Sequence, residues 1–123
     1  MLGGSTFEEQ IGCARAVVTG EWVRVSGTTG FDYATMTISD DVVEQAEQCL
    51  RSMEAALAEA GCTVAEVVRV RYLLPDRADF EPCWPVLRRR FGDVRPAATM
   101  LVCGLADPRM KIEIEVYAQR SAG

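Results

Sequence analysis

The segment from Ala97 to Cys103 limits what this chain can fold into more than any other, because the strand that it predicts is apolar on both faces. Side chains of a strand alternate between its faces, and here the two sets are Ala98, Met100 and Val102 on one side and Thr99, Leu101 and Cys103 on the other. A chain of 123 residues has too few other elements to cover both sets. One row therefore stays exposed, which is typical of a subunit interface and predicts a homo-oligomer.

The remaining patterns predict a single α+β domain over residues 1–123, with residues 1–10 as a loosely ordered segment. The element order is ββαβαββ, and two helices can cover only one face of the resulting sheet. The expected strands are 15–19, 22–26, 67–74, 97–103 and 111–119, and the expected helices are 41–60 and 82–91.

The helix 41–60 is the clearest of these elements, because its apolar residues recur with the 3.6-residue period of a helix. Ser39 is the expected N-cap and Gly61 the stop signal. Asp79 is the expected cap of the second helix, and residues 26–30 are expected to form a loop. The apolar face of the first helix consists of Val42, Ala46, Cys49, Leu50, Met53, Ala56, Leu57 and Ala60.

The expected strand 67–74 alternates between apolar and mixed positions. Its apolar face should carry Val68, Val70, Tyr72 and Leu74.

The charge balance argues against nucleic acid as a partner. Thirteen basic and eighteen acidic residues leave a net charge of −5, the wrong sign for a protein that gains affinity by neutralising phosphates. The basic run 88–90 is expected on the solvated face of a helix end. The absence of histidine excludes a Ser-His-Asp or Cys-His site and an imidazole metal ligand.

The cysteines and the hydropathy pattern indicate a cytoplasmic protein that does not enter a membrane. Five scattered cysteines without a Cys-x-x-Cys pair suit reduced, mostly buried thiols, and no zinc or other metal site is expected. No apolar stretch approaches the roughly 20 residues that a membrane span needs, and the N-terminus lacks the pattern of a signal peptide.

Several segments together resemble the YjgF/RidA family of reactive intermediate deaminases, also called L-PSP endoribonucleases. They are Ser-Gly-Thr-Thr-Gly at 26–30, Ala-Glu-Ala-Gly at 58–61, Arg-Pro-Ala-Ala-Thr at 95–99 and Lys-Ile-Glu-Ile-Glu at 111–115. The resemblance implies a chorismate-mutase-like fold, with one mixed sheet and two helices on one face. It also implies a homotrimer with ligand clefts between subunits, and hydrolysis of small enamines or imines without a cofactor.

Compared position by position, the chain keeps two pocket residues of the family. The catalytic glutamate corresponds to Glu113, and the glycine whose backbone lines the cleft corresponds to Gly27. Four positions differ: Ala98 stands where the family has the arginine that holds the substrate carboxylate, and Cys13, Trp84 and Met100 stand where it has tyrosine, asparagine and cysteine. Alanine cannot hold a carboxylate, so the resemblance implies a divergent branch whose altered cleft favours a less polar or aromatic ligand.

Two groups could complete the expected cleft. Arg95, three residues before Ala98, is a candidate to replace the missing charge, although it could instead be an exposed loop arginine or pair with Asp93.

If Glu113 acts in hydrolysis, it would be a general base or orient water. The Gly27 amide or the Thr28 hydroxyl would then be available to the developing negative charge.

Glu115 and Cys13 each allow two interpretations. Glu115 follows Glu113 on the same strand face at roughly 6.5 to 7 Å, a spacing that suits a carboxylate pair. Cross-strand ion pairs are the simpler interpretation, because Arg24, Arg69 and Arg71 fall on strand faces that can oppose it. For Cys13, we expect a pocket-lining thiol in preference to a nucleophile activated by Arg15.

Three functions remain open at this point. The first is a homotrimeric enzyme that hydrolyses a small imine, enamine or amide-like metabolite. The second is a non-enzymatic trimer that binds a small apolar or aromatic metabolite between subunits. The third, an endoribonuclease, is disfavoured by the net charge and the lack of histidine.

Overall fold

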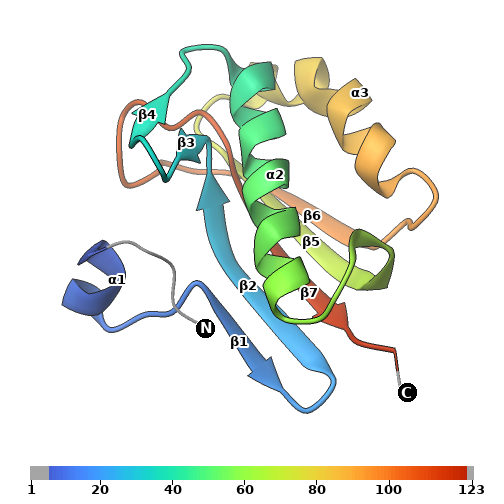
Figure 1. Ribbon diagram of the computed structural model, residues 1–123. Coiled ribbons are helices and arrows are strands. Elements are labelled where there is room, and N and C mark those ends of the chain that lie inside the picture. The colour runs from blue at the N-terminus through green and yellow to red at the C-terminus, as the bar shows by residue number, and fades with distance from the viewer. Residues whose placement is uncertain (1–5, 122–123) are drawn as a thin grey trace.

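The structure, a computed structural model, describes residues 6–121 of the chain (Figure 1). Its elements are α1 (Thr6–Ile11), β1 (Ala16–Thr19), β2 (Trp22–Thr29), β3 (Phe31–Asp32), β4 (Thr37–Ile38), α2 (Val42–Glu59), β5 (Val67–Leu74), α3 (Phe80–Phe91), β6 (Ala97–Val102) and β7 (Glu113–Gln119). Within this range, five strands form a sheet in the order β1-β2-β7-β5-β6. Only β5 and β6 pair in parallel, so the sheet is mixed. The expected α+β class and the order of the seven main elements are confirmed.

Some short elements were not expected. The chain turns through a small hairpin of β3 and β4 between β2 and α2. Residues 6–10 of the N-terminal segment lie in helix α1, and residues 1–5 fall outside the described range. No helix in residues 6–121 is both long and apolar enough to cross a membrane.

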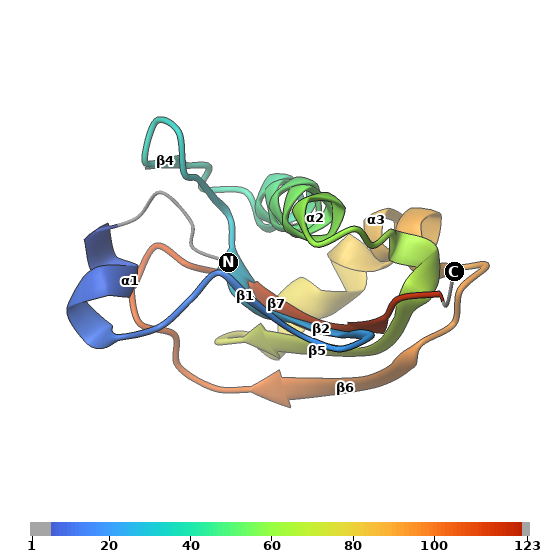
Figure 2. The ribbon, with the colours of Figure 1, turned by 60° about the horizontal axis from the view of Figure 1, so that its bottom comes forward.

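The two long helices lie together on one face of the sheet, as expected (Figure 2). All eight apolar residues predicted for the buried face of α2 are buried, and several, such as Leu50 and Leu57, are completely inaccessible. Burying a leucine side chain contributes about 1.5 to 3 kcal/mol. Three of the five free cysteines, Cys49, Cys62 and Cys83, belong to this core, which confirms the prediction of mostly buried thiols.

The expectation of a loop at residues 26–30 was wrong, because β2 continues through it across a β-bulge. Val25 pairs with Val116 of β7 and Thr28 pairs with Ile114, so the step of three residues in β2 faces a step of two in β7. The extra residue reverses the alternation of β2. Thr28 is therefore fully buried on the helix side of the sheet.

A second bulge corrects the predicted face of β5. The pairing shifts between Val67 and Arg69, opposite Ala118 and Tyr117 of β7. Val67 is consequently buried under the helices, while Val68, which we expected there, is 40% exposed. From Val70 onward the predicted alternation holds.

The start of α2 also differs from the expectation. Asp41 is the N-cap, and its carboxylate accepts a hydrogen bond from the Glu44 N–H at 3.0 Å. The Ser39 hydroxyl, two residues before this cap, instead accepts from the Asp41 N–H and donates to the Glu44 carboxylate. Gly61 follows the C-cap with φ +74°, as expected for a helix stop signal.

Helix α3 begins two residues earlier than predicted, at Phe80. Asp79 occupies its N-cap position but makes no side-chain cap hydrogen bond. The chain enters α3 through a 3-10 turn, Arg77–Asp79, which Asp76 caps by accepting from the Ala78 N–H. This turn gives Asp79 a helical backbone conformation, in which its carboxylate does not reach the free amides.

The basic run at the end of α3 is not simply solvated, as we had expected. Arg90 lies between Glu47 and Glu54 of α2, at 3.0 Å from each carboxylate, and Arg89 pairs with Glu47 at 2.7 Å. These ion pairs connect the two helices. Arg88 instead lines a groove beside α3.

No helix of residues 6–121 lies on the second face of the sheet (Figure 2). Arg71 pairs there with Glu115 at 2.9 Å, which confirms the cross-strand interpretation of Glu115. Arg69 donates to the Thr99 hydroxyl at 2.6 Å. Exposed apolar side chains surround these pairs, among them Val17, Trp22, Leu101 and Tyr117. We call this surface the open face; it is apolar with a polar seam.

One polar side chain in the core was not anticipated, that of Gln45 in α2, which is completely buried. Its amide nitrogen donates to the carbonyls of Ser39 and Arg109 at 2.7 and 2.9 Å. Its amide oxygen accepts from the Lys111 N–H at 2.8 Å. Gln45 thus ties the segment before α2 and the segment before β7 to one helix.

We predict that Gln45→Leu destabilises the fold by about 3 kcal/mol, because two carbonyls and one N–H lose their partner in the core. The free energy of unfolding from urea denaturation measures the loss. Gln48→Leu, one turn along the same helix but bonded only to Ser52 and Arg51, serves as control and should change stability by less than about 0.5 kcal/mol. Equal losses in the two variants would contradict this role of Gln45.

Candidate functional site

Glu113 begins β7 on the open face of the sheet. Thr29 of β2 and Leu73 of β5 are its cross-strand neighbours. Residues that are directly opposite each other in paired strands have side chains on the same face. Thr29, Glu113 and Leu73 therefore form one row across the open face, with Glu113 in the middle.

Gly27 provides the space that the Glu113 carboxylate occupies. A Cβ atom at position 27 would lie 2.5 Å from Glu113 Oε2 and 2.8 Å from its carboxyl carbon, far inside van der Waals contact. The bulge in β2 carries Gly27 to this position. The sequence-predicted pair of Glu113 and Gly27 is therefore brought into direct contact.

The electrostatic surroundings of Glu113 make it a better base than an ordinary glutamate. Its side chain is half-buried, and it accepts no hydrogen bond from any residue within 6–121. Burial raises the pKa of the carboxyl, and the negative charge of Glu115 raises it further. A raised pKa combined with an open position is the usual arrangement for a general base.

Tyr33, which the sequence analysis missed, bonds to the cross-strand neighbour of Glu113. The Tyr33 hydroxyl lies 3.0 Å from the Thr29 hydroxyl and accepts from the Thr29 N–H at 3.1 Å. Arg15 lies over the Tyr33 ring at 4.7 Å. Thr29 is the cross-strand neighbour of Glu113, so these contacts connect the Glu113 position to the Tyr33 phenol and, through its ring, to Arg15. We call Arg15, Gly27, Thr29, Tyr33 and Glu113 the Glu113 cluster.

Thr28 and Cys13 are not brought to Glu113 by interactions within the described residues. The Thr28 hydroxyl donates to the Ser26 carbonyl at 3.1 Å, on the helix side of the sheet. Cys13 is exposed two residues before Arg15, and its thiol makes no hydrogen bond in the described part of the chain.

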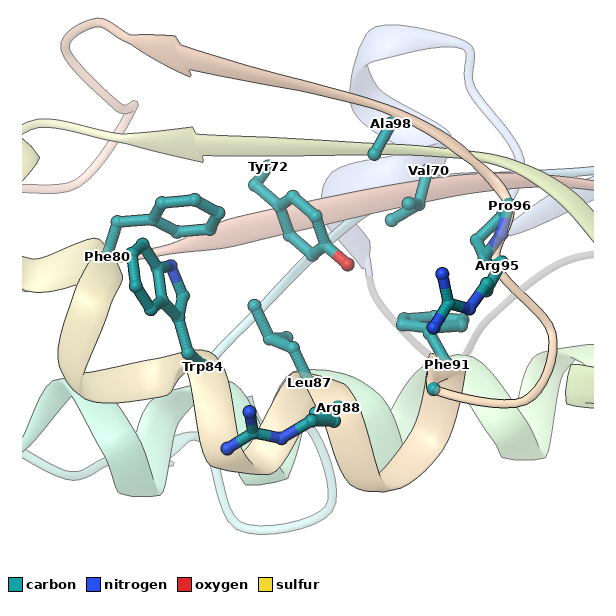
Figure 3. A pocket seen from close by; sticks show the side chains of 11 residues that line it. Val70, Tyr72, Phe80, Trp84, Leu87, Arg88, Phe91, Arg95, Pro96 and Ala98 are labelled. Carbon is teal, nitrogen blue, oxygen red and sulfur yellow. The ribbon is translucent and has the colours of Figure 1, made fainter.

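A groove of about 550 Å³ lies between α3 and the β5–β6 edge of the sheet (Figure 3). Three of the predicted site residues, Trp84, Arg95 and Ala98, line it. The other lining residues are Val70, Tyr72, Phe80, Leu87, Arg88, Phe91, Gly92 and Pro96. Met100 lies beside the groove, because it pairs with Tyr72.

Aromatic rings dominate one end of the groove. Phe80 packs against Tyr72 with ring centroids 5.5 Å apart, and Trp84 meets Phe80 edge to face at 6.0 Å. Trp84 remains 49% exposed, so much of its ring is free to contact a ligand or another subunit.

Arg95 stands at the opposite end of the groove (Figure 3). Its N–H donates to the Phe91 carbonyl at 2.8 Å, so the residue closes the turn that ends α3. Its φ is +53°, in the left-handed region that residues other than glycine rarely adopt. This turn directs the chain into Pro96 and β6.

The Glu113 cluster and the groove lie on opposite faces of one sheet. Glu113 pairs with Leu73 of β5, whereas Ala98 pairs with Val70 of the same strand. Leu73 and Val70 are three positions apart in an alternating strand and point to opposite sides. A single chain therefore does not place Glu113 next to Ala98, Met100, Trp84 or Arg95.

A family model described as Endoribonuclease L-PSP matches residues 10–120 of the chain. Human 2-iminobutanoate/2-iminopropanoate deaminase is 30% identical over 106 residues, covering 85% of this chain and 77% of the human protein.

Solved structures show the same fold. Rv2704 from Mycobacterium tuberculosis, a member of the YjgF/YER057c/UK114 family, superposes with a TM-score of 0.87 at 38% identity, over 97% of this chain and 96% of that one. E. coli TdcF with bound serine superposes with a TM-score of 0.81 at 28% identity, over 88% of this chain and 87% of TdcF. The expected YjgF/L-PSP fold is confirmed.

The carboxyl of Glu113 should titrate above the range of an ordinary glutamate. We predict that Glu115→Gln lowers this pKa, because the substitution removes the neighbouring negative charge and leaves Arg71 without its partner. Carbon-13 NMR titration of the glutamate carboxyls measures both values. Glu59→Gln, on the exposed end of α2, should leave the Glu113 titration unchanged; an equal shift in both variants would contradict the assignment.

Proposed function

Because the chain belongs to the endoribonuclease L-PSP family, also known as YjgF/RidA, we propose that it is a cytoplasmic homotrimer that hydrolyses a small imine or enamine to a carbonyl compound and ammonia. It represents a divergent branch, since Ala98 stands at the position of the substrate-binding arginine. The substrate therefore differs from that of the family's best-studied members.

The observation that supports this proposal most strongly is the environment of the Glu113 carboxylate. Its carboxylate is half-buried, has a raised pKa, rests against Gly27 and is free of hydrogen bonds from residues 6–121. A carboxylate needed only for stability would normally have a partner, as Glu115 has in Arg71.

The trimer provides the second half of the cleft. The open face needs an apolar cover, and the Glu113 cluster and the groove cannot meet within one chain. We infer that the Glu113 cluster of one subunit faces the groove of the next, so that each cleft contains Glu113 from one copy and Trp84, Arg95, Ala98 and Met100 from its neighbour.

The reaction requires only water and a base. Glu113 takes a proton from water as the water oxygen bonds to the C=N carbon, and the electron pair of the double bond moves to nitrogen. Glu113 then returns the proton to nitrogen. As the C–N bond breaks, the hydroxyl oxygen forms the carbonyl and its proton also passes to nitrogen. Both protons of the water finish on nitrogen, which leaves as ammonia.

A non-enzymatic trimer that binds a small apolar or aromatic metabolite is the second candidate. The groove favours it, since four of its eleven described lining residues are aromatic and Ala98 stands where the family has its arginine. Ribonuclease activity, which the family description names, is not favoured by a chain with a net charge of −5 and no histidine.

We predict that Glu113→Gln lowers the rate of imine hydrolysis at least about 100-fold, because glutamine cannot accept the proton. The rate of 2-oxo acid formation from a panel of 2-imino acids, generated in place by an amino-acid oxidase, measures the loss. In the unaltered protein the rate should fall with decreasing pH as the raised pKa of Glu113 is passed, because only the carboxylate form is a base.

Glu59→Gln is the matched control and should keep full activity. Turnover that survives Glu113→Gln would exclude Glu113 as the base. Absence of turnover in the unaltered protein, together with ligand binding, would favour the non-enzymatic candidate.

We further predict that the protein in solution has three times the 13.5 kDa mass of one chain. Leu101→Glu, which places a charge on the open face, should dissociate the assembly because the carboxylate would be buried without a partner. Light scattering after size-exclusion chromatography measures the mass. Met36→Glu makes the same kind of change at a residue that is 58% exposed between β3 and β4, and should leave the trimer intact.

A further inference from the structure

The charged side chains that line the groove between α3 and β6 are all positive among the described residues. Arg88 and Arg95 are the charged side chains among its eleven described lining residues, and none of these residues is acidic. Two positive charges in one groove stand out in a chain whose net charge is −5. The groove therefore offers an anion a local positive field that the molecule as a whole does not.

Tyr72 supplies a hydrogen-bond donor in the middle of the groove. Its side chain is only 7% exposed, and its hydroxyl makes no hydrogen bond with any residue of the described chain. Figure 3 shows the hydroxyl pointing into the groove, away from Phe80. Burial raises the pKa of Tyr72 to about 12, so the hydroxyl keeps its proton and can donate it. No fully buried side-chain oxygen or nitrogen of the described chain lacks a partner, so this hydroxyl opens onto the groove, where a ligand can replace the water that it binds.

The position of Arg95 is fixed by the backbone and not by an ion pair. A hydrogen bond from the Arg95 N–H to the Phe91 carbonyl holds Arg95 in the turn that ends α3. The ring of Pro96, the residue that follows, fixes the φ angle of that residue. Arg95 forms no salt bridge with an acidic residue of the described chain, Asp93 included. Its guanidinium is thus available to a ligand without first breaking a pair.

We propose that this groove binds a small aromatic carboxylate, with the ring at the Phe80–Trp84 end and the carboxylate between the Tyr72 hydroxyl and the Arg95 guanidinium. The ring replaces water on the exposed face of Trp84. The carboxylate gains two charge-assisted hydrogen bonds in a partly desolvated position. Ala98 leaves the space above Val70 open, so that the ligand can lie along the groove (Figure 3).

This inference assigns the substrate class of the cleft, an aromatic 2-imino acid, and to that extent it rests on the proposed function. The binding step does not depend on Glu113 or on turnover. It can therefore be tested with a compound that the protein cannot hydrolyse.

The test is calorimetric titration of the purified protein with three probes: 3-phenylpropanoate, propanoate and 3-phenylpropanamide. Only the first has both ring and charge, and it should bind at least about tenfold more tightly than the other two. Arg95→Gln and Tyr72→Phe should each weaken its binding about tenfold. Arg89→Gln, whose side chain pairs with Glu47 outside the groove, is the matched control and should bind as the unaltered protein does.

The outcomes separate the two proposals. Equal affinity for propanoate and 3-phenylpropanoate would overturn the aromatic end of the site, and unchanged affinity in Arg95→Gln would overturn its carboxylate end. Tight binding of 3-phenylpropanoate that requires Arg95 supports the inference even if no imine is hydrolysed, in which case only the proposed reaction fails. The circular dichroism and melting temperature of each variant verify that a loss of binding is not a loss of fold.

Discussion

The buried amide of Gln45 is the interaction on which the arrangement of the site depends. It holds the carbonyls of Ser39 and Arg109 and the N–H of Lys111, and β7 begins only two residues after Lys111, at Glu113. Gly30 makes this possible, since a Cβ there would lie 2.5 Å from the Gln45 Cβ. The Glu113 end of β7 is thus positioned by a helix that lies on the other side of the sheet.

Hydrophobic periodicity was sufficient to predict the major elements, because the spacing of apolar residues along the sequence indicates which face of a helix or strand is buried. Helix α2 and the seven buried apolar residues within it follow directly from that spacing. The two bulges could not be predicted in this way. They depend on how β2 and β5 register against β7, which is a relation between distant segments, and each reversed the face of a residue, Thr28 or Val68.

The site was predictable only in part. The resemblance identified Glu113 and Gly27, but their contact depends on the bulge that delivers Gly27. Arg15 and Tyr33 reach the same place through a turn and a short hairpin that carry little sequence signal. Tyr72 looked like one apolar strand residue among others, and only its tertiary surroundings distinguish a hydroxyl that lacks a partner. Arg95 was already a candidate from its position in the sequence, but no periodic pattern reveals its left-handed backbone conformation.

In the proposed binding mode, the left-handed turn at Arg95 makes stability and ligand binding favour different residues at one position. An arginine at φ +53° carries about 1 kcal/mol of strain that glycine would relieve. Selection for a more stable fold alone would therefore favour glycine at position 95, at the expense of the charge. If the proposed binding mode holds, homologues that share this turn should have arginine at this position where the cleft binds an anion, and glycine where it does not.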